Sequence, residues 1–220
     1  MPNRPNKKRW VSRFEHDPEL WAHIEPESSR RLLLSALEAF SARGFHSATT
    51  REIGEGAGLS AAGVYVHYKS KTDLLYEISR IGHDASFAAV ESALAGASEG
   101  PVERVCAYVF AFAKWHADNH VLARVIQYEF KNLPTRQFRR IVVIRDRFEE
   151  LMRDELRSGV AAGAFEISDL EGTTLAILSL CIDLVRWYEP APEHTSEHVA
   201  TLYVQLVMGM LRARLPAAVG

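Results

Sequence analysis

The stretch that decides the fold is residues 49–75, TTREIGEGAGLSAAGVYVHYKSKTDLL. Thr49 and Glu52 fit a capping box, in which the threonine hydroxyl accepts a bond from a free backbone N–H and the glutamate returns one. Gly58 follows barely two turns later, where a glycine in the left-handed region ends a helix, and Ser60 then offers a new N-cap. We therefore expect two short helices joined by a tight turn.

The second short helix combines one buried side chain with several exposed ones. Val64 lies six residues past Gly58 and is the apolar residue that holds this helix onto its neighbours. The side chains expected to face outward are those of Ser60, Ala61, Gly63, Tyr65 and His67. A short helix presented beyond a glycine turn is the arrangement with which proteins enter a DNA major groove. The hydroxyls of Thr50 and Tyr65 and the ammonium of Lys71 suit phosphate contacts, which position a protein without reading sequence.

The rest of the chain also shows helical spacing. A first helix opens near Pro26 and should stop at Gly44, with Phe45 folding back onto Phe40. A long helix begins at Ser70, after which further helices are expected at roughly residues 102–116, 121–130, 134–160, 169–187 and 193–214. The alternation typical of strands is absent. The fold class is therefore all-α, with about nine helices.

These patterns divide the chain into three parts. We expect a flexible basic arm at residues 1–25, a helix-turn-helix DNA-binding domain at 26–72, and an effector-binding and dimerisation domain at 73–220. The net charge of −2 hides an asymmetry, because residues 1–80 hold 12 basic against 10 acidic side chains. No apolar run is long enough for a membrane span or a signal peptide, so a cytoplasmic protein is expected. Cys106 and Cys181 fall in apolar helical runs and should be buried, reduced thiols.

Residues 29–77 resemble the DNA-binding head of TetR-type transcription regulators, whose signature is matched by residues 53–75. The resemblance implies that Thr50, Ser60, Tyr65, His67 and Lys71 contact DNA and that Tyr68 packs beneath the reading helix. With the flanking positions added, the expected DNA-binding set is Thr49, Thr50, Arg51, Ser60, Ala61, Gly63, Tyr65, His67, Tyr68 and Lys71.

The head also departs from that pattern. Gly54 and Gly56 stand where the family commonly has alanine, and each glycine weakens a helix interior by about 1 kcal/mol. Val66 stands where an aromatic or polar residue is frequent. Because the reading helix offers few hydrogen-bonding side chains, Arg51, DNA shape and the basic arm are expected to contribute to specificity.

The last two expected helices carry apolar stripes that predict a dimer. Two such helices from each subunit would form a four-helix seam around a twofold axis, and a dimer would place two reading helices on an inverted-repeat operator. The expected seam residues are Leu175, Leu178, Ile182, Val185, Val199, Leu202, Leu206 and Met210. Residues 185–211, which begin VRWYEP, are similar to actinobacterial regulators of sterol and fatty-acyl catabolism. Such regulators respond to acyl-CoA esters, so the resemblance implies an effector of that type.

Between the middle helices we expect an apolar effector cavity, with ordinary core packing as the alternative for each residue. The residues that could line it are Phe112, Trp115, His116, Tyr128, Phe148 and Met152. An arginine cluster could hold CoA phosphates or form a salt-bridged helix surface, and the acidic residues that follow it favour the surface. This cluster consists of Arg136, Arg139, Arg140, Arg145 and Arg147.

Other classes of protein find weaker support. The pairs His116/His120 and His194/His198 have the i, i+4 spacing of zinc ligands, and Asp118 could join the first pair. Neither pair belongs to a His-Glu-x-x-His motif, no third ligand is evident, and no phosphate loop, nucleophile elbow or carboxylate pair occurs. We therefore expect no enzyme, no metal and no cofactor, and the expected partners are DNA, a small effector and a second copy. The alternative is a helical metal-binding or adaptor protein that does not bind DNA.

Overall fold

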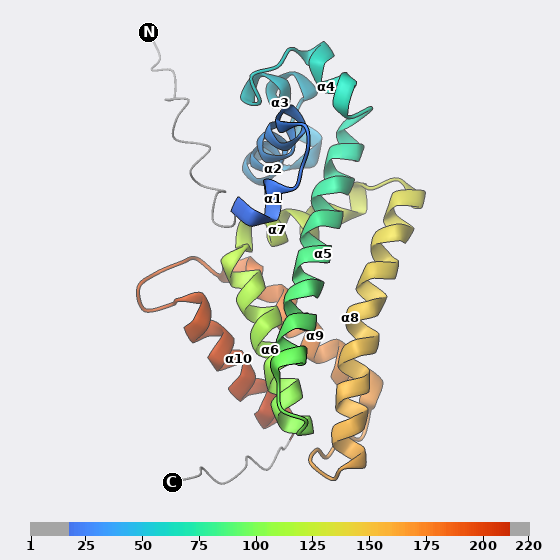
Figure 1. Ribbon diagram of the computed structural model, residues 1–220, viewed down its shortest axis with the longest axis vertical. Helices are drawn as coiled ribbons and strands as arrows, with labels where there is room; N and C mark the ends of the chain where they lie inside the picture. Colours follow the sequence, from blue (N-terminus) through green and yellow to red (C-terminus); the bar gives the residue numbers. More distant parts are fainter. Residues whose placement is uncertain (1–17, 212–220) are drawn as a thin grey trace. The chain divides into compact units, whose positions relative to one another are not determined.

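The computed structural model describes residues 18–211, and within them the regular elements are helices (Figure 1). Ten are α-helices: α1 (Pro18–Ala22), α2 (Glu27–Ser47), α3 (Thr50–Gly56), α4 (Ala61–His67), α5 (Lys71–Gly96), α6 (Pro101–Asp118), α7 (His120–Glu129), α8 (Thr135–Ala161), α9 (Leu170–Trp187) and α10 (Ser196–Met210). A 3-10 turn, Phe130–Asn132, joins α7 to α8. The predicted all-helical fold is confirmed.

One helix falls where a flexible arm was expected. Residues 18–22 form α1, and its Leu20 and Trp21 side chains are buried. Two large apolar side chains in one turn explain why this part of the arm is folded. The basic residues expected in the rest of the arm, at positions 1–17, lie outside the described residues.

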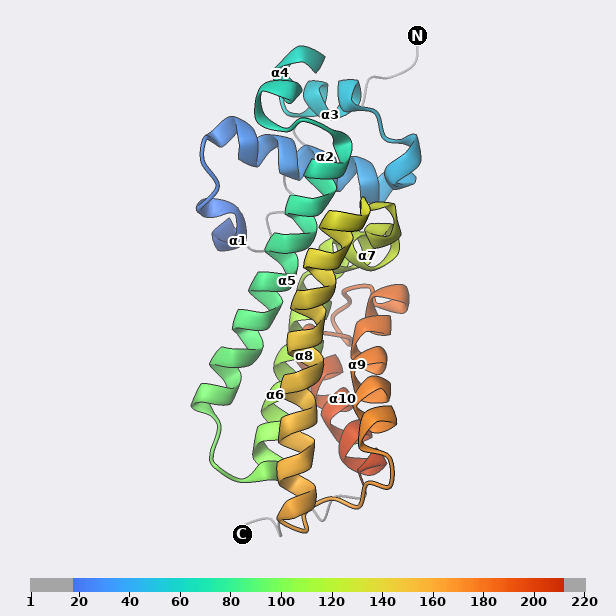
Figure 2. The same ribbon diagram turned by 90° about the vertical axis from the view of Figure 1, so that its right-hand side faces the viewer.

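The chain forms two compact units. The first comprises the chain up to Gly82 together with Val121–Arg140, and the second comprises His83–His120 together with the chain from Ile141. In the first unit α2 packs against α3, and α3 packs against α4 (Figure 2). In the second unit α6 packs against α9 and α10. Helices α5 and α8 each begin in the first unit and end in the second.

The end of α2 follows its predicted geometry. Gly44 has a φ of 76°, in the left-handed region that favours glycine. The Phe45 ring lies 5.3 Å from the Phe40 ring, which confirms the expected apolar contact. The unit's core is filled by the fully buried side chains of Leu32, Leu33, Leu37, Phe40, Ile53, Val64, Leu74, Leu75 and Ile78.

The two glycines of α3 have a packing role that the sequence did not reveal. A Cβ on Gly54 would lie 2.9 Å from the Val64 side chain, and one on Gly56 would lie 2.3 Å from the Ser35 hydroxyl. That hydroxyl donates a hydrogen bond of 2.8 Å to the Ile53 carbonyl. These positions therefore allow α3 to approach both α2 and α4 closely, which offsets their low helix propensity.

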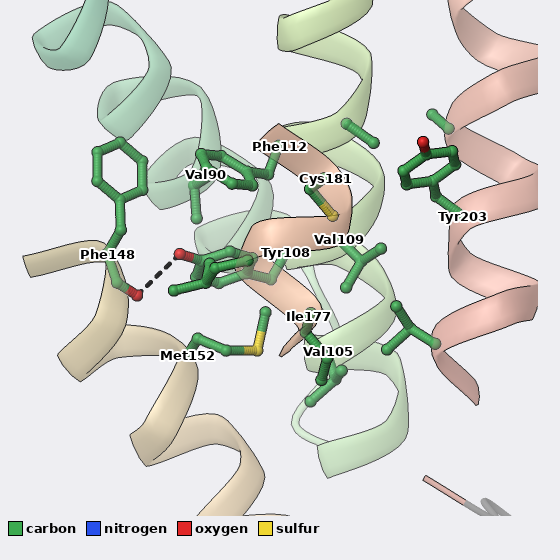
Figure 3. Packing of buried hydrophobic residues seen from close by; sticks show 14 of the residues in the cluster. Val90, Val105, Tyr108, Val109, Phe112, Phe148, Met152, Ile177, Cys181 and Tyr203 are labelled. Carbon is green, nitrogen blue, oxygen red and sulfur yellow. Dashed lines mark hydrogen bonds between the residues drawn. The ribbon is translucent and has the colours of Figure 1, made fainter. Parts of the chain in front are cut away.

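The second unit is held together by a larger apolar cluster (Figure 3). Tyr108 is buried at its centre, and its hydroxyl donates a hydrogen bond of 2.9 Å to the Phe148 carbonyl. Cys181 is buried in the same cluster, and burial raises the pKa of its thiol to about 12. Both thiols are free, as predicted, but Cys106 is only half-buried, whereas burial was expected for both.

A buried ion pair ties α6 to α8. The Arg104 guanidinium donates to both carboxylate oxygens of Glu155, at 2.7 and 2.5 Å. The Glu155 side chain is 8% exposed and that of Arg104 is 31% exposed. Hydrogen bonding to Glu155 raises the pKa of Arg104. Arg104 thus supplies a charge-assisted hydrogen bond to each oxygen of the buried Glu155 carboxylate, and removing one partner of such a pair is costly.

We predict that Arg104→Met lowers the free energy of unfolding by about 3 kcal/mol, because it leaves a buried carboxylate without its cation. The matched double variant, Arg104→Met with Glu155→Met, should recover most of that loss. Urea denaturation followed by circular dichroism measures both. A single variant as stable as the wild type would contradict the assignment.

His116 makes stability depend on pH. Burial is the main cause that lowers the pKa of His116 from 6.5 to about 4; a hydrogen bond to the Phe112 carbonyl opposes this shift, and the nearby Arg145 charge adds to it. Between these pH values the unfolded chain binds a proton that the folded chain does not, so a falling pH favours unfolding.

We predict that His116 contributes full stability above about pH 6.5 and that this contribution is lost as the pH falls toward 4. The expected loss at pH 5 is about 2 kcal/mol relative to pH 7.5. The variant His116→Gln should show a correspondingly flatter pH profile of unfolding free energy. If the unfolding free energy of the wild type and of His116→Gln fell equally steeply with falling pH, the prediction would be refuted.

Candidate nucleic-acid interface

The start of α3 is fixed by the predicted capping box. The Thr49 hydroxyl accepts from the Glu52 N–H at 3.2 Å, and the Glu52 carboxylate accepts from the Thr49 N–H at 3.1 Å. Arg43 donates to the same carboxylate at 2.5 Å. Hydrogen bonds from Arg43 and then from Thr49 lower the pKa of Glu52. The capping box is confirmed, and the Thr49 hydroxyl is engaged in holding α3 rather than free for DNA.

The N-cap and the packing of α4 also follow the sequence. The Ser60 hydroxyl accepts from the Gly63 N–H at 3.1 Å, and Gly58 has a φ of 72°. Val64 is fully buried against α3, at the place where Gly54 leaves room. Gly63 is half-buried, while Ser60 and Ala61 are exposed. One face of α4 is therefore anchored and the other is presented to solvent.

The exposed face of α4 contains an apolar residue that the sequence reasoning missed. The Val66 side chain is 80% exposed and that of Tyr65 is 53% exposed. Ala62, one turn before Val66, is exposed too. The i, i+4 spacing of Ala62 and Val66 could have revealed this second row of the exposed face. Methyl groups dominate the surface, which suits contact with thymine methyls more than hydrogen bonding to bases.

Two hydroxyl groups from different helices meet beside this face. The Thr50 hydroxyl, at the start of α3, lies 3.3 Å from the Tyr65 hydroxyl on α4. Both groups donate and accept hydrogen bonds, and a pair at this distance can bind two oxygens of one phosphate group. The two expected phosphate contacts thus converge on one place.

His67 faces inward, contrary to the expectation that it points outward. Its Nδ1 lies 3.1 Å from the Ser29 hydroxyl on α2, and the residue is half-buried. Tyr68 is also half-buried, and burial raises the pKa of its hydroxyl. The chain turns toward α5 at these two residues. Their side chains therefore pack against the rest of the unit rather than facing solvent.

Lys71 occupies a different place from the one predicted. Its ammonium donates to the carbonyls of Phe45 at 2.5 Å, Ala48 at 2.7 Å and His46 at 3.3 Å. It also lies 4.4 Å from the centre of the Phe45 ring. Burial lowers the pKa of Lys71, and the carboxylate of Glu129 on α7 opposes that effect. Its three N–H donors therefore bind the end of α2, where helix carbonyls are left without partners.

Two basic side chains remain exposed near the reading helix. The Arg51 side chain is 81% exposed and pairs only with the exposed Glu55, at 3.0 Å, in the part of the chain that the structure describes. Lys69 is exposed between α4 and α5. An exposed i, i+4 pair is weak, so Arg51 can exchange Glu55 for a phosphate at little cost.

Five of the six expected cavity residues lie together in the second unit. Phe112, Trp115, His116, Phe148 and Met152 are all buried there. Tyr128 belongs to the first unit and is 46% exposed, so it does not line this interior. The reason is that α7 buries its other face, through Leu122, Ala123, Val125 and Ile126.

The arginine cluster separates into two groups. Four members are exposed, namely Arg136, Arg139, Arg140 and Arg147. Arg145 instead lies half-buried inside the second unit, where burial lowers the pKa of its guanidinium. Further along α8 the ion pairs of Arg153 with Glu149 and of Arg157 with Asp154 form the salt-bridged surface that was favoured.

The expected seam residues also divide. Leu178, Val185 and Val199 are buried within the chain itself, so their side chains are not available to a second copy. Leu178 and Val199 belong to the apolar cluster through which α9 and α10 pack against α6. Ile182 is half-buried. The remaining four are exposed by 40% to 47%: Leu175, Leu202, Leu206 and Met210.

The histidine pairs are engaged in other ways. The Nδ1 groups of His116 and His120 bind the carbonyls of Phe112 and Ala117. The rings of His194 and His198 lie 6.3 Å apart. Within residues 18–211 no three metal-ligating side chains gather. Within the same residues no helix is long and apolar enough to cross a membrane.

Comparisons with known proteins cover both units. Residues 32–78 match the family described as bacterial regulatory proteins, tetR family, and residues 98–211 match the tetracyclin repressor-like C-terminal domain. The HTH-type transcriptional repressor KstR2 of Mycolicibacterium smegmatis is 29% identical over 192 residues, which cover 84% of this chain and 91% of that protein.

Solved structures agree with this assignment. A regulatory protein in the tetR family from Rhodococcus RHA1 is 35% identical, with a TM-score of 0.81 over 86% of this chain and 99% of that one. The ketosteroid transcriptional regulator KstR2 of Mycobacterium tuberculosis is 25% identical, with a TM-score of 0.78 over 87% of this chain and 97% of that one. From its helix-turn-helix head through its C-terminal helices, this chain belongs to the TetR family of bacterial transcriptional regulators.

Proposed function

We propose that the protein is a dimeric repressor that inserts α4 into the major groove of an inverted-repeat operator and releases it when a small effector binds. The observation that carries this proposal is the exposed face of α4 beside the hydroxyl pair of Thr50 and Tyr65. The face can lie against base edges while the hydroxyls bind the adjacent phosphate. Arg51 and Lys69 are both exposed and add positive charge to the helix-turn-helix segment.

A dimer is supported by the exposed apolar side chains of the last two helices. Leu202, Leu206 and Met210 follow one another at helical spacing on α10, and each is at least 40% exposed. Leu175 on α9 is exposed as well. Apolar stripes of this kind commonly pair around a twofold axis. Two reading helices about 34–36 Å apart would then fit successive major grooves.

The effector is proposed to be an apolar or acyl-CoA molecule. The relatives named KstR2 are transcriptional repressors, and one of them is called a ketosteroid transcriptional regulator. The second unit has an interior rich in aromatic side chains, to which such a molecule is suited. If the effector lowers the affinity of the protein for DNA by a given factor, DNA lowers the affinity of the protein for the effector by the same factor.

Selection of duplexes from genomic fragments by the purified protein, followed by sedimentation of protein and complex, tests this function. We expect recovered sequences with an inverted repeat and a protein that sediments as a dimer. Leu206→Asp should yield a folded monomer that binds the selected duplex at least tenfold more weakly, whereas Ser168→Asp, an exposed control in the same unit, should not. A monomeric wild type, or no enrichment of any duplex, would refute the proposal.

A second experiment separates the roles of Lys71 and Tyr65. Tyr65→Phe should weaken binding to selected and unrelated duplexes alike by about fivefold, because about one neutral hydrogen bond to a phosphate is lost, and it should leave the stability unchanged.

Lys71→Met should lower the free energy of unfolding by about 1–3 kcal/mol and weaken DNA binding as a consequence. The slope of log affinity against log salt concentration should stay unchanged in Lys71→Met. A slope reduced by about one would show instead that Lys71 contacts a phosphate.

A further inference from the structure

Inside the second unit, three helices each place a polar side chain one turn away from a buried phenylalanine. These pairs are His83 and Phe87 on α5, His116 and Phe112 on α6, and Arg145 and Phe148 on α8. The fold brings the two histidines and the arginine to one level of the bundle, above one level of aromatic rings.

The aromatic layer is continuous. The Phe148 ring centre lies 5.0 Å from that of Phe87 and 5.1 Å from that of Phe112. All three rings are at most 6% exposed. Rings at these separations and angles form a stable apolar layer against which a hydrocarbon skeleton can pack.

The polar layer adjoins it directly. The His116 ring lies 4.4 Å from the Phe112 ring, and its Nδ1–H donates to the Phe112 carbonyl at 2.8 Å. The Arg145 Nε–H donates to His83 Nε2 at 3.2 Å. His83 and His116 are at most 9% exposed. The layer thus combines a guanidinium with two imidazoles in a largely apolar interior.

Ser86 adds a hydroxyl group to this interior. It lies one turn after His83 on the buried stripe of α5, and it is 2% exposed. Its hydroxyl has no hydrogen-bond partner among residues 18–211. A buried hydroxyl without a partner is costly, so an acceptor oxygen supplied from outside the chain would be favoured beside it.

We propose that Arg145 and His83 of this polar layer, together with Ser86 one turn further along α5, form the subsite for a carboxylate group of the effector, whose hydrocarbon part packs on the aromatic layer. A planar guanidinium fork matches a carboxylate geometrically, and the Ser86 hydroxyl supplies another donor. This inference rests on the proposed control by an effector and narrows the chemical class of that effector. The effector is an apolar molecule with an anionic oxygen group at its buried end, and a molecule whose buried end is hydrocarbon binds weakly.

The test uses two probes with the same chain, decanoate and methyl decanoate, titrated calorimetrically into the full-length protein. Decanoate should bind the wild type at least about tenfold more tightly, because a charged hydrogen bond is gained only with the carboxylate. Arg145→Met should bind the two probes equally. Arg157→Met, which removes an exposed arginine from the same helix, should keep the full preference.

Folding and DNA binding are controlled separately. Circular dichroism and binding of the selected duplex without probe should match the wild type in Arg145→Met. If that variant does not fold, Ser86→Ala supplies the second test and should reduce the preference for decanoate severalfold. Failure of decanoate to bind the wild type, equal affinity for both probes, or an unchanged preference in Arg145→Met or Ser86→Ala would overturn the subsite. A wild type that prefers decanoate but binds no duplex would refute the proposed function and leave the subsite standing.

Discussion

The close approach of Val64 to Gly54 is the constraint on which the orientation of α4 depends. A Cβ at position 54 would lie 2.9 Å from a Val64 methyl and 3.2 Å from two backbone carbonyls, so any other residue there would force α4 to shift from the position it takes against α3. The 7-residue helices α3 and α4 are too short to be stable alone. Their orientation therefore comes from this contact and from the caps at Thr49 and Ser60, and the exposed face of α4 follows from it.

The junction around Lys71 extends this constraint to helices distant in the chain. Lys71 holds the last carbonyls of α2, and Glu129 of α7 lies beside Gly44 and interacts electrostatically with Lys71. Gln137, in the first turns of α8, donates to Asp73 at 2.7 Å. Residues 121–140 therefore fasten the start of α5. This segment is joined covalently to helices that build the second unit. A ligand bound in that unit would alter DNA affinity only if it binds two states of the protein with different affinities.

Local features of the fold were predictable, whereas long-range contacts were not. The capping box at Thr49, the turn glycines and the contact of Phe45 with Phe40 each involve residues at most five positions apart, and all are confirmed. Lys71 binds carbonyls 23 to 26 positions away, and His67 meets Ser29 across 38 positions. A sequence pattern does not specify which partner a side chain meets at that separation. The same reason explains why the apolar stripes of α9 and α10 did not reveal which leucines and valines are buried within the chain.

The side chains of α4 also limit how such a head can discriminate among DNA sequences. Its exposed face presents the methyl groups of Ala61, Ala62 and Val66, which can contact thymine methyls but form no hydrogen bonds with bases. The polar groups nearby, the Thr50 and Tyr65 hydroxyls, suit phosphate. Under the proposed function, binding strength would come from the backbone, and sequence preference from thymine contacts and DNA deformability. Specificity would then rest on the simultaneous fit of two heads to correctly spaced half-sites, because one methyl-lined helix discriminates weakly by itself.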